Sequence, residues 1–172
     1  EAKRCGATIQ LPCVNKSTYK TNIYGSYIYM GFIHIAGIEE RIARSIEEIR
    51  QTEGAAFADL NDFVSRVNPG LEQIILLIRA GALRFTGKKK AVLLWESHMM
   101  INRSKPNLIR PLFSPPVKNF TLPDLEQDKL DDAYDEIELL SFPVSMTWFD
   151  MLKTSFRGEM KARDMINHIG QK

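Results

Sequence analysis

The sequence has little cysteine and no long apolar run, and we expect no leader segment. Its two cysteines, Cys5 and Cys13, are too few for a disulfide framework, and no Cys-x-x-Cys spacing occurs. With three scattered histidines they form no zinc-binding pattern, so we expect two reduced thiols in a cytoplasmic protein and no metal site. No stretch approaches the roughly 18 apolar residues of a membrane helix, and no signal peptide opens the chain. We therefore expect no membrane partner.

The composition is that of a folded domain. The chain has 172 residues, of which 44% are hydrophobic and 26% charged, enough for one core of ordinary size. The net charge of +2 neither requires nor excludes nucleic acid, because local patches matter more than the total. The chain opens on Glu-Ala-Lys-Arg without a methionine, so we expect it to be a piece of a longer protein.

Residues 1–30 predict short strands and turns. The run from Tyr24 to Tyr29 favours a hairpin with Gly25 and Ser26 at its bend. The tyrosines have two open interpretations: a platform on which bases stack, or cross-strand packing in a half-buried sheet. The second is commoner, because stacking platforms usually add basic residues on the same face.

Apolar periodicity predicts helices over 39–52, 59–67, 71–80 and 88–102, and further helices near 131–140, 146–155 and 159–168. Between them, residues 103–123 hold five prolines and favour an extended linker. The acidic cluster at 124–138 is interpreted as a solvated helix start. We predict a mainly α fold, a tandem helix-hairpin-helix with a small β element near the N-terminus and an extended Pro-rich linker to C-terminal helices. The expected segments are 1–30, 31–102, 103–130 and 131–172.

The first predicted hairpin lies at residues 35–39, which read Ile-Ala-Gly-Ile-Glu and are followed by Ala43 and Ile46. A helix-hairpin-helix has apolar-x-Gly-apolar-Gly here, because glycine lets the backbone approach a phosphate that the next helix N-terminus attracts. Such a hairpin holds the sugar-phosphate backbone without reading sequence. The candidate DNA contacts are Gly37, Ile38 and Glu39. Glu39 replaces the second glycine and would repel a phosphate, so DNA contact by this hairpin stays open.

A second predicted hairpin spans residues 79–84, and Gly87 and three lysines open the following helix. Five basic residues therefore lie near one helix N-terminus, which favours phosphate contact. The alternative is that the lysines form only a soluble face. The candidate DNA contacts here are Gly81, Ala82, Leu83, Arg84, Lys88, Lys89 and Lys90.

Two segments of the chain resemble the C-family bacterial replicative DNA polymerases. They are residues 57–67 (Phe-Ala-Asp-Leu-Asn-Asp-Phe-Val-Ser-Arg-Val), between the hairpins, and residues 77–82 (Leu-Ile-Arg-Ala-Gly-Ala), at the second hairpin. The likeness extends to residues 11–17 (Leu-Pro-Cys-Val-Asn-Lys-Ser) and 136–143 (Glu-Ile-Glu-Leu-Leu-Ser-Phe-Pro), and so spans nearly the whole chain. The resemblance implies a fragment running from the end of the fingers, through the tandem hairpins, to the linker before the OB domain.

The resemblance also implies which partners the fragment binds and which domain of the parent protein is catalytic. The family's magnesium-binding aspartates belong to a palm domain that would precede this fragment, so the fragment itself would be non-catalytic and hold no cofactor. Duplex DNA would be bound without sequence preference. A sliding-clamp peptide would include Leu112 and Phe113, although Ile109 replaces its glutamine. Glu39, Arg84, Ser141 and Ile109 all depart from the family pattern, in which an aspartate is usual at the position of Arg84. They leave open an alternative role as a structural or protein-interaction segment of a diverged paralog.

Overall fold

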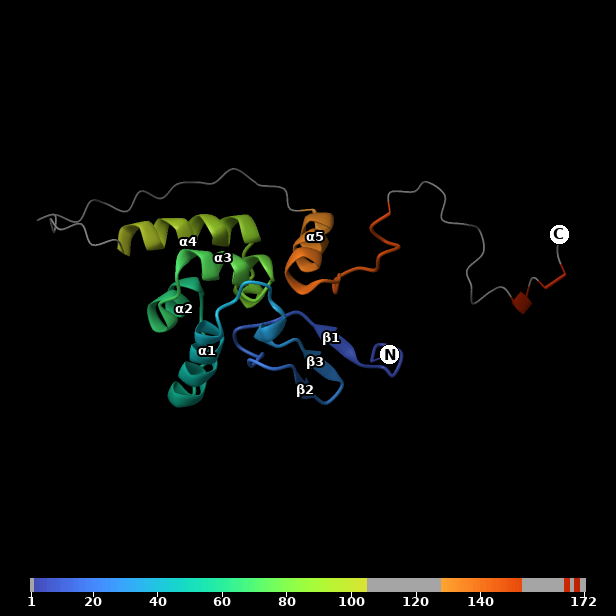
Figure 1. The fold of residues 1–172 in the computed structure, drawn as a ribbon, viewed down its shortest axis with the longest axis horizontal. Coiled ribbons are helices and arrows are strands. Elements are labelled where there is room, and N and C mark those ends of the chain that lie inside the picture. The colour runs from blue at the N-terminus through green and yellow to red at the C-terminus, as the bar shows by residue number, and fades with distance from the viewer. Residues whose placement is uncertain (1, 105–127, 153–165, 168, 171–172) are drawn as a thin grey trace, which may run out of the picture.

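A computed structural model of the chain describes residues 2–104, 128–152, 166–167 and 169–170 (Figure 1). The mainly helical prediction is confirmed, with a small sheet near the N-terminus. The strands are β1 (Thr8–Gln10), β2 (Asn22–Tyr24) and β3 (Tyr27–Tyr29). The helices are the 3-10 turns η1 (Phe32–His34) and η2 (Arg84–Thr86), and α1 (Glu40–Glu53), α2 (Leu60–Val67), α3 (Leu71–Arg79), α4 (Lys90–Ser104) and α5 (Lys129–Leu140).

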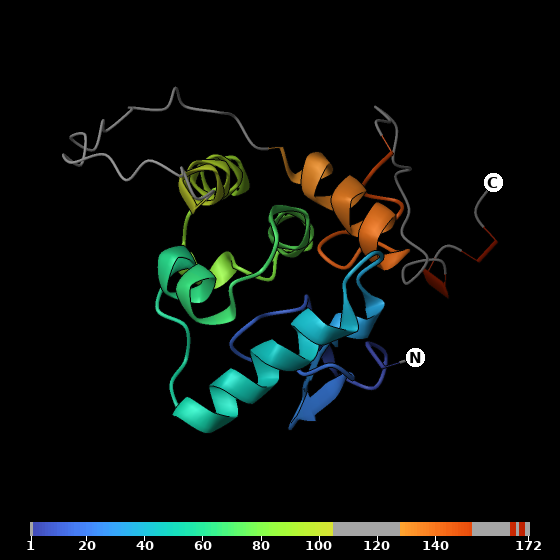
Figure 2. The ribbon, with the colours of Figure 1, turned by 60° about the vertical axis from the view of Figure 1, so that its left-hand side comes forward.

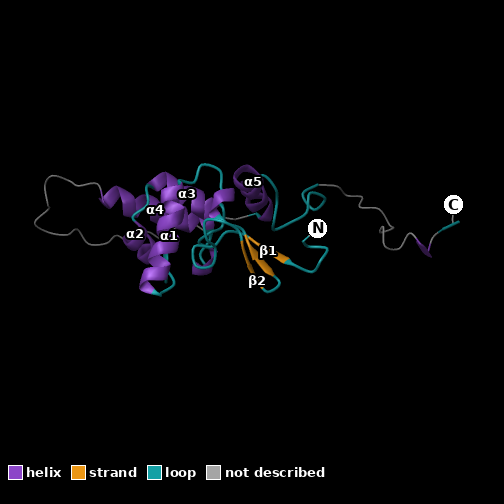
Figure 3. Ribbon diagram, turned by 60° about the horizontal axis from the view of Figure 1, so that its bottom comes forward, coloured by secondary structure: helices purple, strands orange, loops and turns teal. Residues whose placement is uncertain are grey.

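The sheet confirms the predicted hairpin. Its strand order is β1-β3-β2, with β1 parallel and β2 antiparallel to β3. Gly25, with φ of +59°, and Ser26 form the two-residue bend between β2 and β3. A first turn residue with positive φ matches the twist of such a hairpin. Figure 3 shows the strands grouped on one side of the helices.

The helices pack around α3, which lies between α4 and α5 (Figure 2). Ile74, Leu77 and Ile78 of α3 are almost completely buried. This confirms that a helix with apolar residues around most of its circumference lies at the centre of the core. Helix α1 packs against the same core through Ile42 and Ile46, which are buried and lie one helical turn apart.

Two expected helices differ from the structure. The helix predicted over 88–102 begins at Lys90, because Gly87 takes a φ of +69° and the Lys88 N–H donates to Thr86 Oγ1 at 3.3 Å. The helix predicted over 146–155 is a single turn over its described part, residues 146–152. There Asp150 accepts from both the hydroxyl (2.6 Å) and the N–H (3.1 Å) of Thr147. Side-chain bonds of this kind compete with helix formation.

A candidate nucleic-acid interface at two hairpins

The first hairpin turns at Gly37, whose φ is +80°. The N–H of Glu39, which would point at a phosphate, instead donates to Oε1 of the buried Gln73 at 2.8 Å. The Gln73 amide also donates to the Gly37 carbonyl at 3.2 Å. One side chain from α3 therefore ties both sides of this turn, and the amide of Glu39 is already satisfied.

The charges around the first hairpin are paired locally. The exposed Glu39 carboxylate accepts from Arg41 at 3.3 Å, and Glu40 accepts from Arg44 at 2.7 Å. The hydrogen bond that Arg44 donates to Glu40 raises the pKa of Arg44 above its ordinary value. Gly37, Glu39, Glu40 and Arg41 all remain exposed. The turn is therefore open to solvent, but its surface is of mixed charge.

The second hairpin ends α3 with a Schellman motif. The Ala82 N–H donates to the Leu77 carbonyl at 2.8 Å, and the Gly81 N–H donates to Ile78 at 2.9 Å. Gly81 adopts the left-handed conformation that this motif requires, with φ of +75°. The carbonyl of Ala82 then accepts from the Val14 N–H at 3.0 Å. The turn is thereby joined to the N-terminal segment.

The structure places Gly81, Ala82 and Leu83 inside the core. Gly81 is buried, and Ala82 and Leu83 have no exposed surface. A buried backbone whose groups are already paired has nothing to offer a phosphate. These three candidate residues therefore shape the hairpin, and the interface proposed below does not use them.

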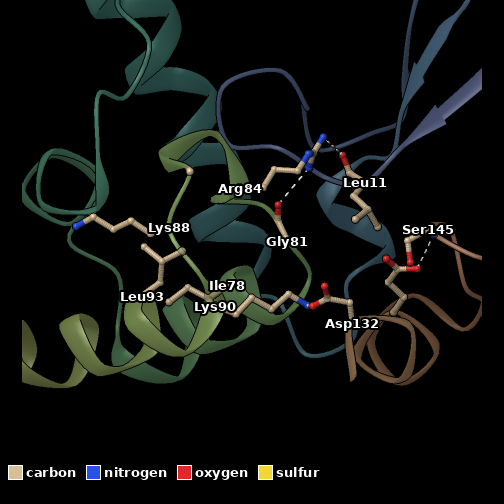
Figure 4. Close-up of a pocket in the computed structure, with 11 residues that line it drawn as sticks. Leu11, Ile78, Gly81, Arg84, Lys88, Lys90, Leu93, Asp132 and Ser145 are labelled. Carbon is tan, nitrogen blue, oxygen red and sulfur yellow. Dashed lines mark hydrogen bonds and ion pairs between the residues drawn. The ribbon is translucent and has the colours of Figure 1, made fainter. Parts of the chain in front are cut away.

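Arg84 connects the second hairpin to the N-terminal segment through hydrogen bonds. Its guanidinium donates to the carbonyls of Pro12 (2.6 Å), Leu11 (3.1 Å) and Gly81 (3.1 Å). Figure 4 shows the bonds to Leu11 and Gly81. The planar fork of arginine can donate to several carbonyls at once, which the aspartate typical of the resembled family could not do. In this structure the donors of Arg84 are directed at the protein's own backbone.

The three lysines at the start of α4 have different surroundings. Lys88 pairs with Glu96, further along α4, at 2.7 Å, and its side chain is 44% exposed. Lys90 pairs with Asp132 at 2.8 Å and Asp135 at 3.1 Å, and is 19% exposed. Lys89 is exposed. Lys88 and Lys90 extend in opposite directions (Figure 4), so the lysine run is divided between an open side and a side facing α5.

Helix α5 corrects the prediction for the acidic cluster. Its carboxylates are not simply solvated, because Asp132 and Asp135 face Lys90, and Asp135 and Glu138 face Arg79. The hydrogen bonds that Arg79 donates to Glu138 and, to a lesser degree, to Asp135 raise the pKa of Arg79, and the Arg79 guanidinium lowers the pKa of Glu138. The acids of α5 therefore offset basic charge at the second hairpin.

A cavity of about 280 Å³ lies between the second hairpin and α5. Arg84, Lys88 and Lys90 line one side, and Asp132, Glu136 and Ser145 line the other (Figure 4). Helix α5 also meets the first hairpin, because the Leu139 carbonyl accepts from the Ala36 N–H at 2.8 Å. Sequence reasoning missed these partners, since Gln73 and the α5 acids are remote in sequence from the turns that they contact.

Several sequence predictions concern residues outside the part of the chain that the structure describes. The candidate clamp residues Leu112 and Phe113 lie outside the described residues, as does most of the expected linker and of the helix predicted over 159–168. Within the described ranges, no three His, Cys, Asp or Glu side chains gather to hold a metal ion. No helix in those ranges has the length and apolar character that a membrane crossing needs.

Comparison with known proteins identifies the motif. A family model described as a helix-hairpin-helix motif matches residues 6–93, from just before β1 into α4, and so includes both hairpins. No curated protein matches the chain. Motifs of this kind generally bind DNA, which supports duplex DNA as a partner. Because the match covers half of the sequence and both glycine turns lie within it, the chain belongs to the helix-hairpin-helix motif family.

Proposed function

We propose that the chain holds the backbone of duplex DNA without reading its sequence, as a non-catalytic part of a bacterial C-family replicative polymerase similar to the polymerase III alpha subunit. The observation that supports DNA contact best is the combination of the family match with the Lys88–Lys90 run at a glycine-opened helix start. In this proposal the fragment runs from the end of the fingers, through the tandem hairpins, to the linker before the OB domain of a cytoplasmic replicase. Magnesium chemistry belongs to a palm domain elsewhere in that parent chain.

Lys88 and Lys89 are the main contacts in this proposal. Both are exposed at the amino-terminal end of α4, where the helix dipole favours an anion. The bond from Lys88 to Glu96 is a half-exposed surface pair, and such pairs contribute little free energy. A phosphate can therefore compete for Lys88 at small cost. Lys90 is more enclosed and is held by two carboxylates, so we rank it below the other two.

The first hairpin contributes less in this proposal. Its Glu39 N–H is satisfied by Gln73, and the Glu39 and Glu40 carboxylates sit beside the turn. A phosphate there would meet two negative charges before it met Arg41 or Arg44. Gly37 still permits a close backbone approach, since it is exposed.

A salt titration tests the proposal. Binding of a fluorescently labelled 20-base-pair duplex to the 172-residue chain is measured by anisotropy across a series of salt concentrations. Lys88→Ala with Lys89→Ala should weaken binding at low salt and reduce the slope of log K against log salt by about 2, because each of the two lysines neutralises one phosphate. The matched control is Lys20→Ala with Lys129→Ala, which removes the same charge from exposed positions outside the hairpins. Absent binding at low salt, or equally weakened binding in both double variants, would overturn the proposal.

The alternative function is a structural and protein-interaction segment. It is favoured by the pairing of Arg79 and Lys90 with α5, because this pairing leaves less basic charge for DNA. Capture of the chain on an immobilised bacterial sliding clamp, with Leu112→Ala and Phe113→Ala as the test variant, examines the clamp contact. Clamp capture that depends on these two residues, together with no duplex binding, would favour the alternative.

A further inference from the structure

The sheet has an exposed face made of tyrosines. Tyr24, Tyr27 and Tyr29 share this face, because side chains alternate along a strand and Tyr24 is directly opposite Tyr27 in the register. Tyr24 is 51% and Tyr27 49% exposed. The rings of Tyr24 and Tyr29 meet edge to face, with 5.9 Å between centroids. Large aromatic surface is thus offered to solvent on a small, regular sheet.

This face forms one wall of a cavity of about 390 Å³, which we call the tyrosine pocket. Its other walls are Asn15 and Lys16, from the turn after β1, and Arg50, from the last turn of α1. The lining contains two cationic side chains and no carboxylate. The volume is in the range of pockets that hold small organic ligands.

The cationic wall is held in place by the fold. The Arg50 guanidinium donates to the carbonyls of Val14 (2.7 Å) and Ser17 (2.8 Å), which fixes its plane beside the pocket. Asn15 donates to the Phe57 carbonyl (2.9 Å) and accepts from the Phe57 N–H (2.8 Å), which anchors the turn. Lys16 is exposed, and no carboxylate lines the pocket beside it among the residues that the structure describes. The pocket therefore has one positive charge held in position, on Arg50, and a second on the exposed side chain of Lys16.

We propose that the tyrosine pocket binds an unpaired nucleotide of single-stranded DNA. The base stacks on Tyr27, and the adjoining phosphate lies against Lys16 and Arg50. Aromatic faces interleaved with cations, without carboxylates, are the combination with which proteins bind single strands independently of sequence. A base in a duplex cannot enter such a pocket, because both of its faces are covered by its neighbours. An apolar peptide carries no negative charge to compensate the positive charges of Lys16 and Arg50.

The structure also favours the other of the two interpretations of the tyrosines, the stacking platform. From the sequence alone, cross-strand packing is favoured because the strands themselves carry no basic residue on the tyrosine face. The missing cations come from other segments, since Lys16 precedes β2 and Arg50 lies in α1. This inference is independent of the proposed duplex contact, because the tyrosine pocket and the cavity at the second hairpin share no lining residue.

Anisotropy with a labelled 12-nucleotide oligothymidine tests the proposal on the intact chain. Tyr27→Ala should weaken binding about 5- to 100-fold, the range expected when one base has no ring to stack on. Tyr27→Phe keeps the aromatic face and should bind within about twofold of the parent chain. Lys16→Ala should lower the slope of log K against log salt by about 0.7, the value for one single-strand phosphate contact.

Two controls separate stacking from general attraction or misfolding. Tyr134→Ala removes a 60% exposed tyrosine from α5, outside the pocket, and should leave binding unchanged. An abasic oligomer of equal length and charge should bind as weakly to the parent chain as the oligothymidine binds to Tyr27→Ala. If the abasic oligomer binds as well as the oligothymidine does, or if Tyr27→Ala and Tyr134→Ala have the same effect, the proposal fails. Weak binding by Tyr27→Phe would also overturn it, because the ring that stacks is retained.

Discussion

Several single residues in this protein make their decisive contacts with segments that are distant in the sequence. Glu39 stands where a phosphate-binding hairpin has glycine, and the structure shows Gln73 bonded to its N–H in place of an anion. Arg84 stands where the resembled family has an acid, and it donates to three carbonyls. Gly31 takes an ordinary φ of −74°, so backbone strain does not require glycine there. A close approach of the chain does: a β-carbon on Gly31 would lie 2.4 Å from the carbonyl carbon of Lys20 and 2.6 Å from the Thr21 nitrogen.

Gly31→Ala should therefore destabilise the fold by about 3 kcal/mol or more, because backbone atoms cannot move aside as a flexible side chain can. Urea denaturation followed by circular dichroism measures the free energy of unfolding. Gly70→Ala is the matched control, since its φ is −67° and its β-carbon would meet nothing within 4 Å. The control should change stability by less than about 1 kcal/mol. Equal stability of the two variants would contradict the close approach at Gly31.

Among the elements, α5 contacts both hairpins and supplies the carboxylates that pair with basic residues of the second. It contacts the first hairpin through the Leu139 carbonyl and the second through pairs with Arg79 and Lys90. The family match ends at residue 93, so α5 lies outside it. Two of its carboxylates, Asp132 and Asp135, pair with Lys90. Under the proposed function, α5 and DNA compete for this cation.

Asp132→Asn with Asp135→Asn should raise duplex affinity at low salt and steepen the slope of log K against log salt by about 1, because Lys90 becomes available to a phosphate. Anisotropy of the labelled duplex across salt concentrations measures both quantities. Asp131→Asn with Glu48→Gln makes the same change in net charge at two exposed positions, and should leave the slope unchanged. A slope that shifts equally in both double variants would show a general charge effect and not release of Lys90.

At the scale of the whole molecule, the two candidate surfaces are separate. The second hairpin and α5 surround one cavity, and the sheet, the turn after β1 and the end of α1 surround the other. The strands lie on the side of the helical body away from α4 (Figures 1 and 3). A duplex on one surface and an unpaired strand on the other would suit DNA that contains both, such as a junction between them.

Duplex and single strand should therefore bind at the same time. A saturating concentration of unlabelled duplex should leave the affinity for labelled oligothymidine within about twofold, because neither ligand covers residues of the other's site. The competition is measured at constant salt, since added counterions weaken both interactions. Displacement of the oligothymidine by the duplex would show that a single surface binds both.

Local features are predictable from the sequence by itself. The helices near 39–52, 59–67, 71–80 and 131–140, the tyrosine hairpin and the glycine turns all follow from apolar periodicity and from the conformations open to glycine, which act over a few neighbouring residues. The same reasoning places both hairpins inside the region that the family model matches.

The long-range partners of the charged and aromatic side chains are decided by tertiary structure alone. Lys90 meets Asp135 across 45 residues, Arg79 meets Glu138 across 59, and the tyrosines of β2 and β3 share a pocket with Arg50 of α1. Whether a lysine run is open to DNA depends on what packs beside it, and whether a tyrosine face has cations depends on which turns lie next to it. Packing is a property of the whole chain, so a local pattern predicts the hairpins but not the surface that they present.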